Sequence, residues 1–198
     1  MTKNNIKGMI FDLDGTLVTS DIDFGYLKQQ IGCPNHADIL AYINQLTDPA
    51  EQQAAQTLVV QMELEDALAS QWIPGAKAFL AQLLEHDIPM AIVTRNCRAA
   101  SSMKIAHHDI PIQLVLTRED AVSKPDPEAL NIIAQQWGFE PNEIAYVGDY
   151  IYDIQAANRA KMHAWSYRYL VPAGETGHID RYFECYTELD VKQLSMVD

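Results

Sequence analysis

The stretch Ile10-Phe11-Asp12-Leu13-Asp14-Gly15-Thr16-Leu17 joins an apolar run to two closely spaced acids and a glycine. Residues 9–11 are typical of the end of a buried strand. Because residues two apart in a strand point to the same face, Asp12 and Asp14 are expected to come together where the strand ends. Two crowded carboxylates repel each other unless a cation lies between them. Mg²⁺, which favours oxygen ligands, is the expected cation.

Beyond Pro74-Gly75 the chain alternates between apolar runs and amphipathic segments. This alternation predicts a parallel sheet covered by helices on both faces, an α/β fold with three layers of the Rossmann-like kind. The predicted strands are residues 9–11, 88–93, 112–116, 144–147, 163–167 and 183–186. The predicted helices are residues 76–86, 97–107, 127–137, 151–160 and 189–194.

Residues 18–73 carry no strand pattern. Three helices are predicted there, at residues 24–31, 37–46 and 50–72, separated by breaks at Pro34 and at Asp48-Pro49. We therefore expect an α/β core formed by residues 1–17 and 74–198, with a small α-helical subdomain inserted at 18–73.

The composition is that of a globular protein, with 48% apolar and 21% charged residues. A net charge of −13 argues against a nucleic acid polymer or an anionic membrane as partner. Residues 1–8 lack the apolar core of a signal peptide, and three widely spaced cysteines suit reduced thiols. We expect a cytoplasmic monomer or small homo-oligomer that acts on a small phosphorylated metabolite.

Polar clusters follow the predicted strands. They are Asp12-Leu13-Asp14, Thr94-Arg95-Asn96, Lys124-Pro125 in the loop beyond the strand at 112–116, and Gly148-Asp149. In a parallel sheet, ligands bind outside the carboxyl ends of the strands, so one edge would gather all four clusters. Paired carboxylates, a hydroxyl and an ammonium group suit phosphoryl transfer, where catalysis is mostly positioning and charge neutralisation.

These four motifs, in this order, resemble those of the haloacid dehalogenase superfamily, and of its phosphoglycolate-phosphatase-like phosphatases in particular. The matching segments are Asp12-Leu13-Asp14-Gly15-Thr16, Thr94, Lys124-Pro125-Asp126-Pro127 and Gly148-Asp149-Tyr150-Ile151-Tyr152-Asp153. The resemblance covers residues 10 to about 155 and implies a Mg²⁺-dependent phosphatase that forms an aspartyl-phosphate.

The resemblance also implies a role for each matching residue. Asp12 corresponds to the nucleophile and a metal ligand, and Asp14 to the general acid/base whose backbone carbonyl also binds the metal. Thr94 and Lys124 correspond to the phosphate binders. Asp149 corresponds to the third protein ligand of Mg²⁺, with Asp153 as a supporting acid. Residues 18–73 lie where such proteins insert a helical cap over the substrate.

Other interpretations stay open at this point. A phosphosugar mutase of the same superfamily would share every motif, and a non-catalytic phospho-accepting or binding domain would share several. Thr94 and Asp149 also suit helix N-caps, and Asp153 suits a helix surface. Arg95 and Asn96 are candidates for substrate contact through either their side chains or their backbone.

The inserted helices are strongly acidic, with eight acids against the single base Lys28. A solvated outer face explains this charge most simply. The alternative hypothesis is that the leaving group of the substrate carries little negative charge beyond its phosphate. The acids are Asp21, Asp23, Asp38, Asp48, Glu51, Glu63, Glu65 and Asp66.

Overall fold

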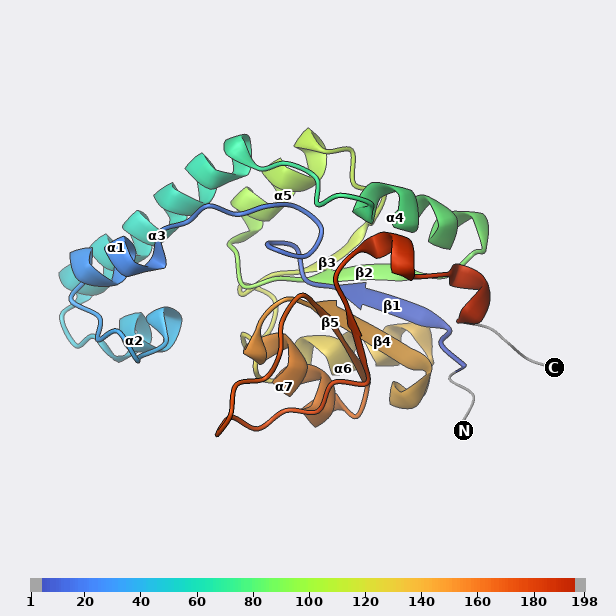
Figure 1. Cartoon of the computed structure of the whole chain (residues 1–198). Helices are drawn as coiled ribbons and strands as arrows, with labels where there is room; N and C mark the ends of the chain where they lie inside the picture. Colours follow the sequence, from blue (N-terminus) through green and yellow to red (C-terminus); the bar gives the residue numbers. More distant parts are fainter. Residues whose placement is uncertain (1–4, 195–198) are drawn as a thin grey trace.

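The computed structural model describes residues 5–194, so the first and last four residues of the predicted core lie outside the described part. A single parallel sheet of six strands runs through the molecule in the order β3-β2-β1-β4-β5-β6 (Figure 1). The strands are β1 (Gly8–Phe11), β2 (Met90–Val93), β3 (Leu114–Leu116), β4 (Ile144–Gly148), β5 (His163–Tyr167) and β6 (Arg181–Phe183). The predicted α/β class with a parallel sheet is confirmed.

Seven α-helices are described between residues 5 and 194. They are α1 (Phe24–Gln30), α2 (Ile39–Gln45), α3 (Pro49–Ala69), α4 (Ala76–Glu85), α5 (Arg98–His107), α6 (Glu128–Trp137) and α7 (Ile151–Ala160). Short 3₁₀ turns are η1 (Pro141–Glu143), η2 (Tyr186–Glu188) and η3 (Val191–Gln193). No helix in this described range is both long and apolar enough to cross a bilayer.

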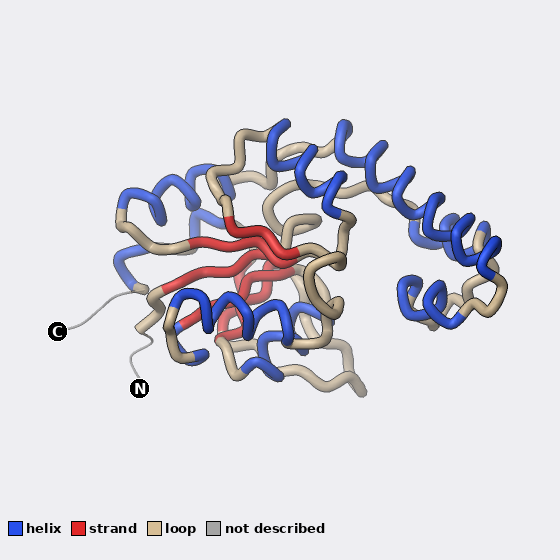
Figure 2. Tube along the Cα trace, turned by 180° about the vertical axis from the view of Figure 1, so that it is seen from behind, coloured by secondary structure: helices blue, strands red, loops and turns tan. Residues whose placement is uncertain are grey.

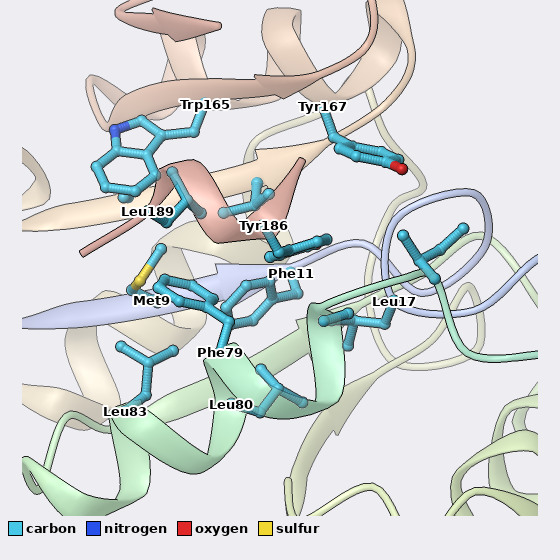
Figure 3. Close-up of a cluster of buried hydrophobic side chains, with 14 of the residues drawn as sticks. Met9, Phe11, Leu17, Phe79, Leu80, Leu83, Trp165, Tyr167, Tyr186 and Leu189 are labelled. Carbon is cyan, nitrogen blue, oxygen red and sulfur yellow. The ribbon is translucent and has the colours of Figure 1, made fainter. Parts of the chain in front are cut away.

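Helices cover both faces of the sheet (Figure 2). Each face carries its own core, because alternate strand residues point to opposite sides. Met9 and Phe11 of β1 pack against α4 and the turn η2, where Phe79 and Tyr186 are buried (Figure 3). Ile10, between them in the chain, packs on the other face against α6 and α7. The apolar residues of β1 therefore contribute to both cores.

The order of the strands places β1 at a switch point of the sheet. The chain passes from β1 to β2 and β3 on one side, then crosses to β4, β5 and β6 on the other. Phe11, at the end of β1, is level with Ile92 of β2 and Val147 of β4. Ligands bind at such points because the loops beyond the strands diverge there.

The helices α1, α2 and α3 extend to one side of the sheet and share a hydrophobic cluster of their own (Figure 1). Each begins at an aspartate whose side chain accepts a hydrogen bond from the first turn: Asp23, Asp38 and Asp48 respectively. Such N-caps satisfy backbone N–H groups that have no partner within the helix. The three predicted helices of residues 18–73 are therefore present.

Two predicted helices differ from the structure, and the strand predicted at 183–186 lies at Arg181–Phe183 instead. The helix expected at 50–72 ends at Ala69, because Ser70 is extended and Trp72 forms an antiparallel bridge with Val18. The closing helix expected at 189–194 is replaced by the single short turn η3, and the turn η2 comes just before this segment. There the backbone is extended at Asp190, whose side chain caps η3 instead of continuing a helix.

Shortening a buried side chain in the core beneath α4 should lower the stability of the protein. Phe79 is 2% exposed and lies with its ring centroid 6.4 Å from Phe11 and 5.7 Å from Tyr186. We expect Phe79→Ala to lower the free energy of unfolding by about 3–5 kcal/mol, as large-to-small core substitutions do. Leu84→Ala, at an exposed position of the same helix, should cost less than about 1 kcal/mol. Urea denaturation measures both, and equal losses would contradict this packing.

Candidate active site

Three of the predicted polar clusters meet at the carboxyl ends of neighbouring strands. Asp12 follows β1, Thr94 follows β2 and Asp149 follows β4. The backbone continues the sheet for one more residue, since the Asp12 N–H donates to the carbonyl of Val147 at 2.8 Å. Lys124 reaches the same place from the loop after β3, and its side chain is buried. One edge of the sheet thus gathers all four clusters.

Gly15 allows the loop after β1 to turn back toward β4. Its φ is +73°, a left-handed conformation, and a Cβ at this position would lie 2.1 Å from an Asp149 carboxylate oxygen. The next residue, Thr16, donates its hydroxyl to the other Asp149 oxygen at 2.9 Å. A side chain at residue 15 would therefore push the loop away from Asp149.

Asp12, Asp149 and Asp153 form a compact cluster of acids, each with a carboxylate oxygen within 4.8 Å of the others. The Lys124 ammonium lies 2.8 Å from Asp12 and 2.7 Å from Asp153. The buried Tyr146 hydroxyl accepts a hydrogen bond from Lys124 at 2.7 Å and donates to Asp153 at 2.9 Å. This network holds the nucleophile candidate and the supporting acid in fixed positions.

Burial and mutual repulsion alter the acidity of this cluster. Burial raises the pKa of Asp12 well above its usual range, Asp153 and Asp149 add repulsion, and Lys124 opposes the shift. Burial and the nearby Asp153 raise the pKa of Asp149 to about 7. Burial alone would lower the pKa of Lys124, but Asp12 and Asp153 outweigh it and raise the pKa. The lysine is therefore charged, and the three acids, once all ionised, would carry more negative charge than this one lysine balances.

The cluster fits a hard divalent cation such as Mg²⁺. It offers carboxylate oxygens in close approach, an excess of negative charge and no sulfur or imidazole ligand among the three side chains. A second cation would relieve the repulsion that raises the pKa of Asp12 and Asp149. The side chain of Asp14 lies outside this group, which leaves only its backbone carbonyl for the metal role that the resemblance implies.

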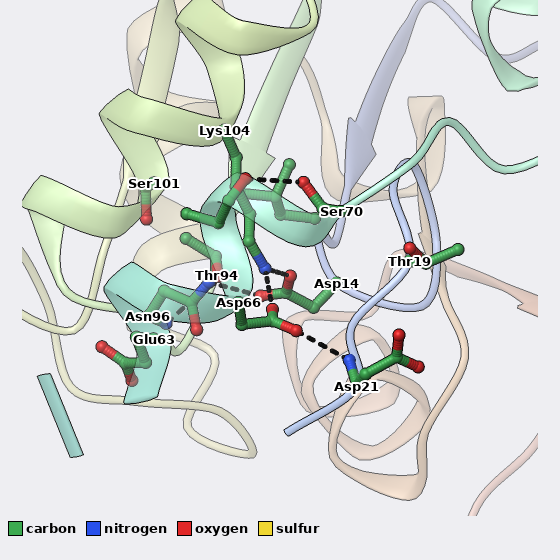
Figure 4. Close-up of polar contacts among 12 residues, drawn as sticks. Asp14, Thr19, Asp21, Glu63, Asp66, Ser70, Thr94, Asn96, Ser101 and Lys104 are labelled. Carbon is green, nitrogen blue, oxygen red and sulfur yellow. Dashed lines mark hydrogen bonds and ion pairs between the residues drawn. The ribbon is translucent and has the colours of Figure 1, made fainter. Parts of the chain in front are cut away.

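The Asp14 carboxylate instead pairs with two core side chains (Figure 4). One oxygen contacts the ammonium of Lys104, on α5, and the other accepts a hydrogen bond from the Asn96 amide. Lys104 is fully buried, and its ammonium also lies 2.5 Å from Asp66 of α3. The other Asp66 oxygen accepts the backbone N–H of Asp21 at 2.7 Å. Asp14 is thus tied, through one lysine, to the last part of the inserted helices.

The sequence motifs do not single out Lys104 or Asp66 as site residues. A signal for them exists: Lys104 lies four residues after Ala100 on the buried stripe of α5, and Asp66 lies seven residues after Val59 on the buried stripe of α3. A charged residue within a buried stripe indicates a charged partner, because isolated buried charges are costly. The identity of that partner requires the tertiary structure.

The residues after β2 contact neighbours with their side chains. The buried Thr94 hydroxyl accepts the Asn96 N–H at 3.1 Å. The Arg95 guanidinium lies 2.5 Å from Asp38 at the start of α2, and 4.7 Å from the centre of the Tyr152 ring. The side chains of Arg95 and Asn96 therefore each contact a carboxylate, that of Asp38 and that of Asp14 respectively.

The acids of the inserted helices divide into two groups. Asp38, Glu63 and Asp66 pair with Arg95, Arg118 and Lys104 of the core. The remaining five are exposed, as a solvated outer face requires: Asp21, Asp23, Asp48, Glu51 and Glu65. The simple interpretation of the acidic charge therefore describes five of the acids, and the other three dock the helices on the core.

Acids and a lysine at the carboxyl edge of a parallel sheet form a site at which a charged ligand can bind. The chain belongs to the haloacid dehalogenase-like hydrolase family, whose model matches residues 9–166. The predicted family and the prediction of a hydrolase are confirmed.

Individual relatives agree with this membership. A haloacid dehalogenase-like hydrolase domain-containing protein of Arabidopsis thaliana is 29% identical over 162 residues, which cover 76% of this chain and 66% of the plant protein. A phosphoglycolate phosphatase of Yersinia pseudotuberculosis is 29% identical over 183 residues, 78% of each chain. A haloacid dehalogenase-like hydrolase from Bacteroides fragilis has the same fold, with a TM-score of 0.75 at 20% identity, over 93% of this chain and all of that one.

The raised pKa of Asp149 predicts how stability changes with pH. The carboxyl ordinarily ionises near 3.8, but the folded protein holds its proton until about pH 7. The folded state thus binds more protons between these values, and the free energy of unfolding falls as pH rises through this window. With a chelator present, the free energy of unfolding should fall between pH 5 and pH 8. We expect Asp149→Asn to reduce this fall by roughly 1–3 kcal/mol, since one pKa unit corresponds to about 1.4 kcal/mol.

Urea denaturation at both pH values measures this difference. Added Mg²⁺ should restore stability at pH 8 in the unsubstituted protein and much less in Asp149→Asn, because binding to the folded state stabilises it. The same pH dependence in both proteins would contradict the raised pKa.

Removal of the Lys104 ammonium should destabilise the protein by leaving Asp14 and Asp66 without their partner. We expect Lys104→Met to cost about 3–5 kcal/mol of unfolding free energy, as the loss of one member of a buried ion pair does. Lys104→Met with Asp66→Asn should recover part of this loss, because one buried charge is then absent. A cost below about 1 kcal/mol for Lys104→Met would show that this network carries little stability.

Proposed function

We propose that this protein is a Mg²⁺-dependent phosphatase that hydrolyses a small phosphate monoester through an aspartyl-phosphate. The observation that carries the proposal is the meeting of Asp12, Asp149 and Asp153 around the Lys124 ammonium at the switch point of the sheet. The similarity to phosphoglycolate phosphatases supports the reaction class. Asp12 and Asp149, with the Asp14 backbone carbonyl, would hold Mg²⁺, which supplies charge neutralisation between the nucleophile and the phosphate.

In this proposal Asp12 is the nucleophile. Its carboxylate oxygen attacks phosphorus, the bond from phosphorus to the alcohol oxygen breaks, and an aspartyl-phosphate forms. Lys124 and the Thr94 hydroxyl bind phosphate oxygens as negative charge develops on them. The support is positional: both side chains are buried at the same edge as Asp12, and Lys124 already contacts it at 2.8 Å.

Asp14 is the proposed general acid and base. Burial raises its pKa more than Lys104 and Asn96 lower it, so this carboxyl group binds a proton more readily than an exposed aspartate does. Asp14 gives this proton to the leaving alkoxide, then takes one from the water that attacks phosphorus. The bond between phosphorus and Asp12 breaks in that second step, and free phosphate and the original carboxylate result. Lys104 and Asn96 hold Asp14 in position.

We also propose that residues 18–73 form a cap over an α/β core of residues 1–17 and 74–198. Two features support this division. The inserted helices share their own hydrophobic cluster, and the chain enters and leaves them side by side, with Thr19 N–H donating to the Gln71 carbonyl at 2.8 Å. The described free thiols Cys33, Cys97 and Cys185 suit a reducing compartment, and we propose a cytoplasmic location.

Asp12→Asn tests the mechanism directly. An amide is a poor nucleophile, so phosphate release with Mg²⁺ should fall at least about 1,000-fold, as it does when other enzymes lose their nucleophile. Circular dichroism should show an unchanged fold. Asp87→Asn is the matched control, because Asp87 is exposed and precedes β2 at the opposite edge of the sheet. Near-normal turnover by Asp12→Asn would refute the mechanism.

A further inference from the structure

The cations around the proposed site are already neutralised by carboxylates. Lys124 contacts Asp12 and Asp153, and Lys104 contacts Asp14 and Asp66. The cations Arg95 and Arg118 each pair at 2.5 Å with an acid of the inserted helices. Among these four cations, Lys124 is the one proposed to bind the phosphate. None of the four is left unpaired to bind a second anionic group of the substrate.

Arg95 is the cation best placed to meet a leaving group. It follows Thr94 directly, so it lies next to the proposed phosphate site. Its guanidinium stacks on Tyr152, in the first turn of α7, one residue before Asp153. Arg95 therefore links the end of β2 to the start of α7. Its side chain is 23% exposed, which leaves it within reach of a bound molecule.

Asp38 holds Arg95 from the inserted helices. One oxygen of Asp38 accepts the Ala41 N–H at 2.9 Å and caps α2, while the other pairs with Arg95 at 2.5 Å. Burial raises the pKa of Asp38, but these two contacts outweigh burial, and the net effect lowers the pKa. Asp38 is therefore ionised and oriented by its own helix, so it cannot turn away from Arg95 without loss of its capping bond.

The one base of the inserted helices is also engaged. Lys28, the single base between residues 18 and 73, donates to the Asn35 carbonyl at 2.6 Å. Arg168 lies beyond β5, where it stacks over Tyr167 at 5.6 Å. Neither residue contacts the acid cluster of Asp12, Asp149 and Asp153. The pairing of Arg95 thus determines whether a second anionic group beside the phosphate finds a cationic partner.

We propose that Asp38 is a specificity residue that restricts the site to phosphate monoesters of uncharged alcohols. The inference rests on the proposed phosphatase function and names its substrate class. A carboxylate or second phosphate near the scissile phosphate would have to displace Asp38 from Arg95. Asp38 would then remain partly buried, ionised and close to a like charge, which is a repulsive element of the kind that creates specificity.

Two substrates of matched size test this proposal in the unsubstituted protein with Mg²⁺. Phosphoglycolate carries a carboxylate beside its phosphate ester, and 2-hydroxyethyl phosphate carries an uncharged hydroxymethyl group in the same place. We expect kcat/KM for 2-hydroxyethyl phosphate to exceed that for phosphoglycolate by at least about tenfold, the lower range for a charge-assisted contact. Equal values, or faster hydrolysis of phosphoglycolate, would overturn the proposal.

Asp38→Asn isolates the residue, because asparagine keeps the capping bond and removes the charge. We expect the preference for 2-hydroxyethyl phosphate to fall by roughly tenfold, as Arg95 becomes able to receive the carboxylate. Asp48→Asn is the matched control: it caps α3 in the same way, is exposed and contacts no core cation in the described structure. Its substrate preference should equal that of the unsubstituted protein.

A double variant assigns the effect to Arg95. Asp38→Asn with Arg95→Gln lacks the cation, so the gain in phosphoglycolate hydrolysis should disappear. An unchanged preference in Asp38→Asn, confirmed with Asp38→Ser and with circular dichroism for both, would overturn the inference while leaving the phosphatase intact. Absence of phosphate release from every ester, including p-nitrophenyl phosphate, would overturn the proposed function and this inference with it.

Discussion

Three carboxylates lie close together beyond β1 and β4, and the ammonium of Lys124 lies among them. Their repulsion is the constraint on which the site depends. The sheet order forces the approach by placing β1 beside β4, and Gly15 permits it by leaving space for Asp149. The buried Tyr146 hydroxyl also holds the cluster together, by hydrogen bonds with Lys124 and Asp153. One lysine cannot neutralise three ionised acids, and a divalent cation would balance the negative charge that remains.

A second set of charges links the inserted helices to the core. Glu63 and Asp66, both buried on α3, pair with Arg118 and Lys104, and Asp38 pairs with Arg95. Replacement of one partner would leave the other charge unpaired in a poorly hydrated place. Each pair therefore fixes where the inserted helices dock on the core. Lys104 has a particular place in this set, because it also holds Asp14. The orientation of the proposed proton donor is therefore coupled to the way in which α3 docks.

Much of the fold could be predicted because it depends on local patterns. Apolar strands such as Ile144–Gly148 and helices bounded by proline and glycine, such as α6, carry their signals within a few residues. Four polar motifs in order predict where the site lies. Lys104 and Asp66 could not be predicted as a pair, because α3 and α5 are brought together only by tertiary packing. The prediction of a helix at 189–194 is wrong because Leu189, Val191 and Leu194 are buried as in a helix, while the extended backbone at Asp190 limits the segment to one short turn. The predicted roles of the site residues remain predictions.

The central claim is that Asp12 carries the phosphoryl group. Asp14→Asn with p-nitrophenyl phosphate tests it most directly, because this leaving group departs without a proton while the hydrolysis of the intermediate still needs a base. We predict one rapid equivalent of nitrophenolate per enzyme molecule, and an acid-quenched peptide containing Asp12 that is heavier by one phosphoryl group. A steady release without a burst, or a phosphoryl group on any residue other than Asp12, would contradict the account.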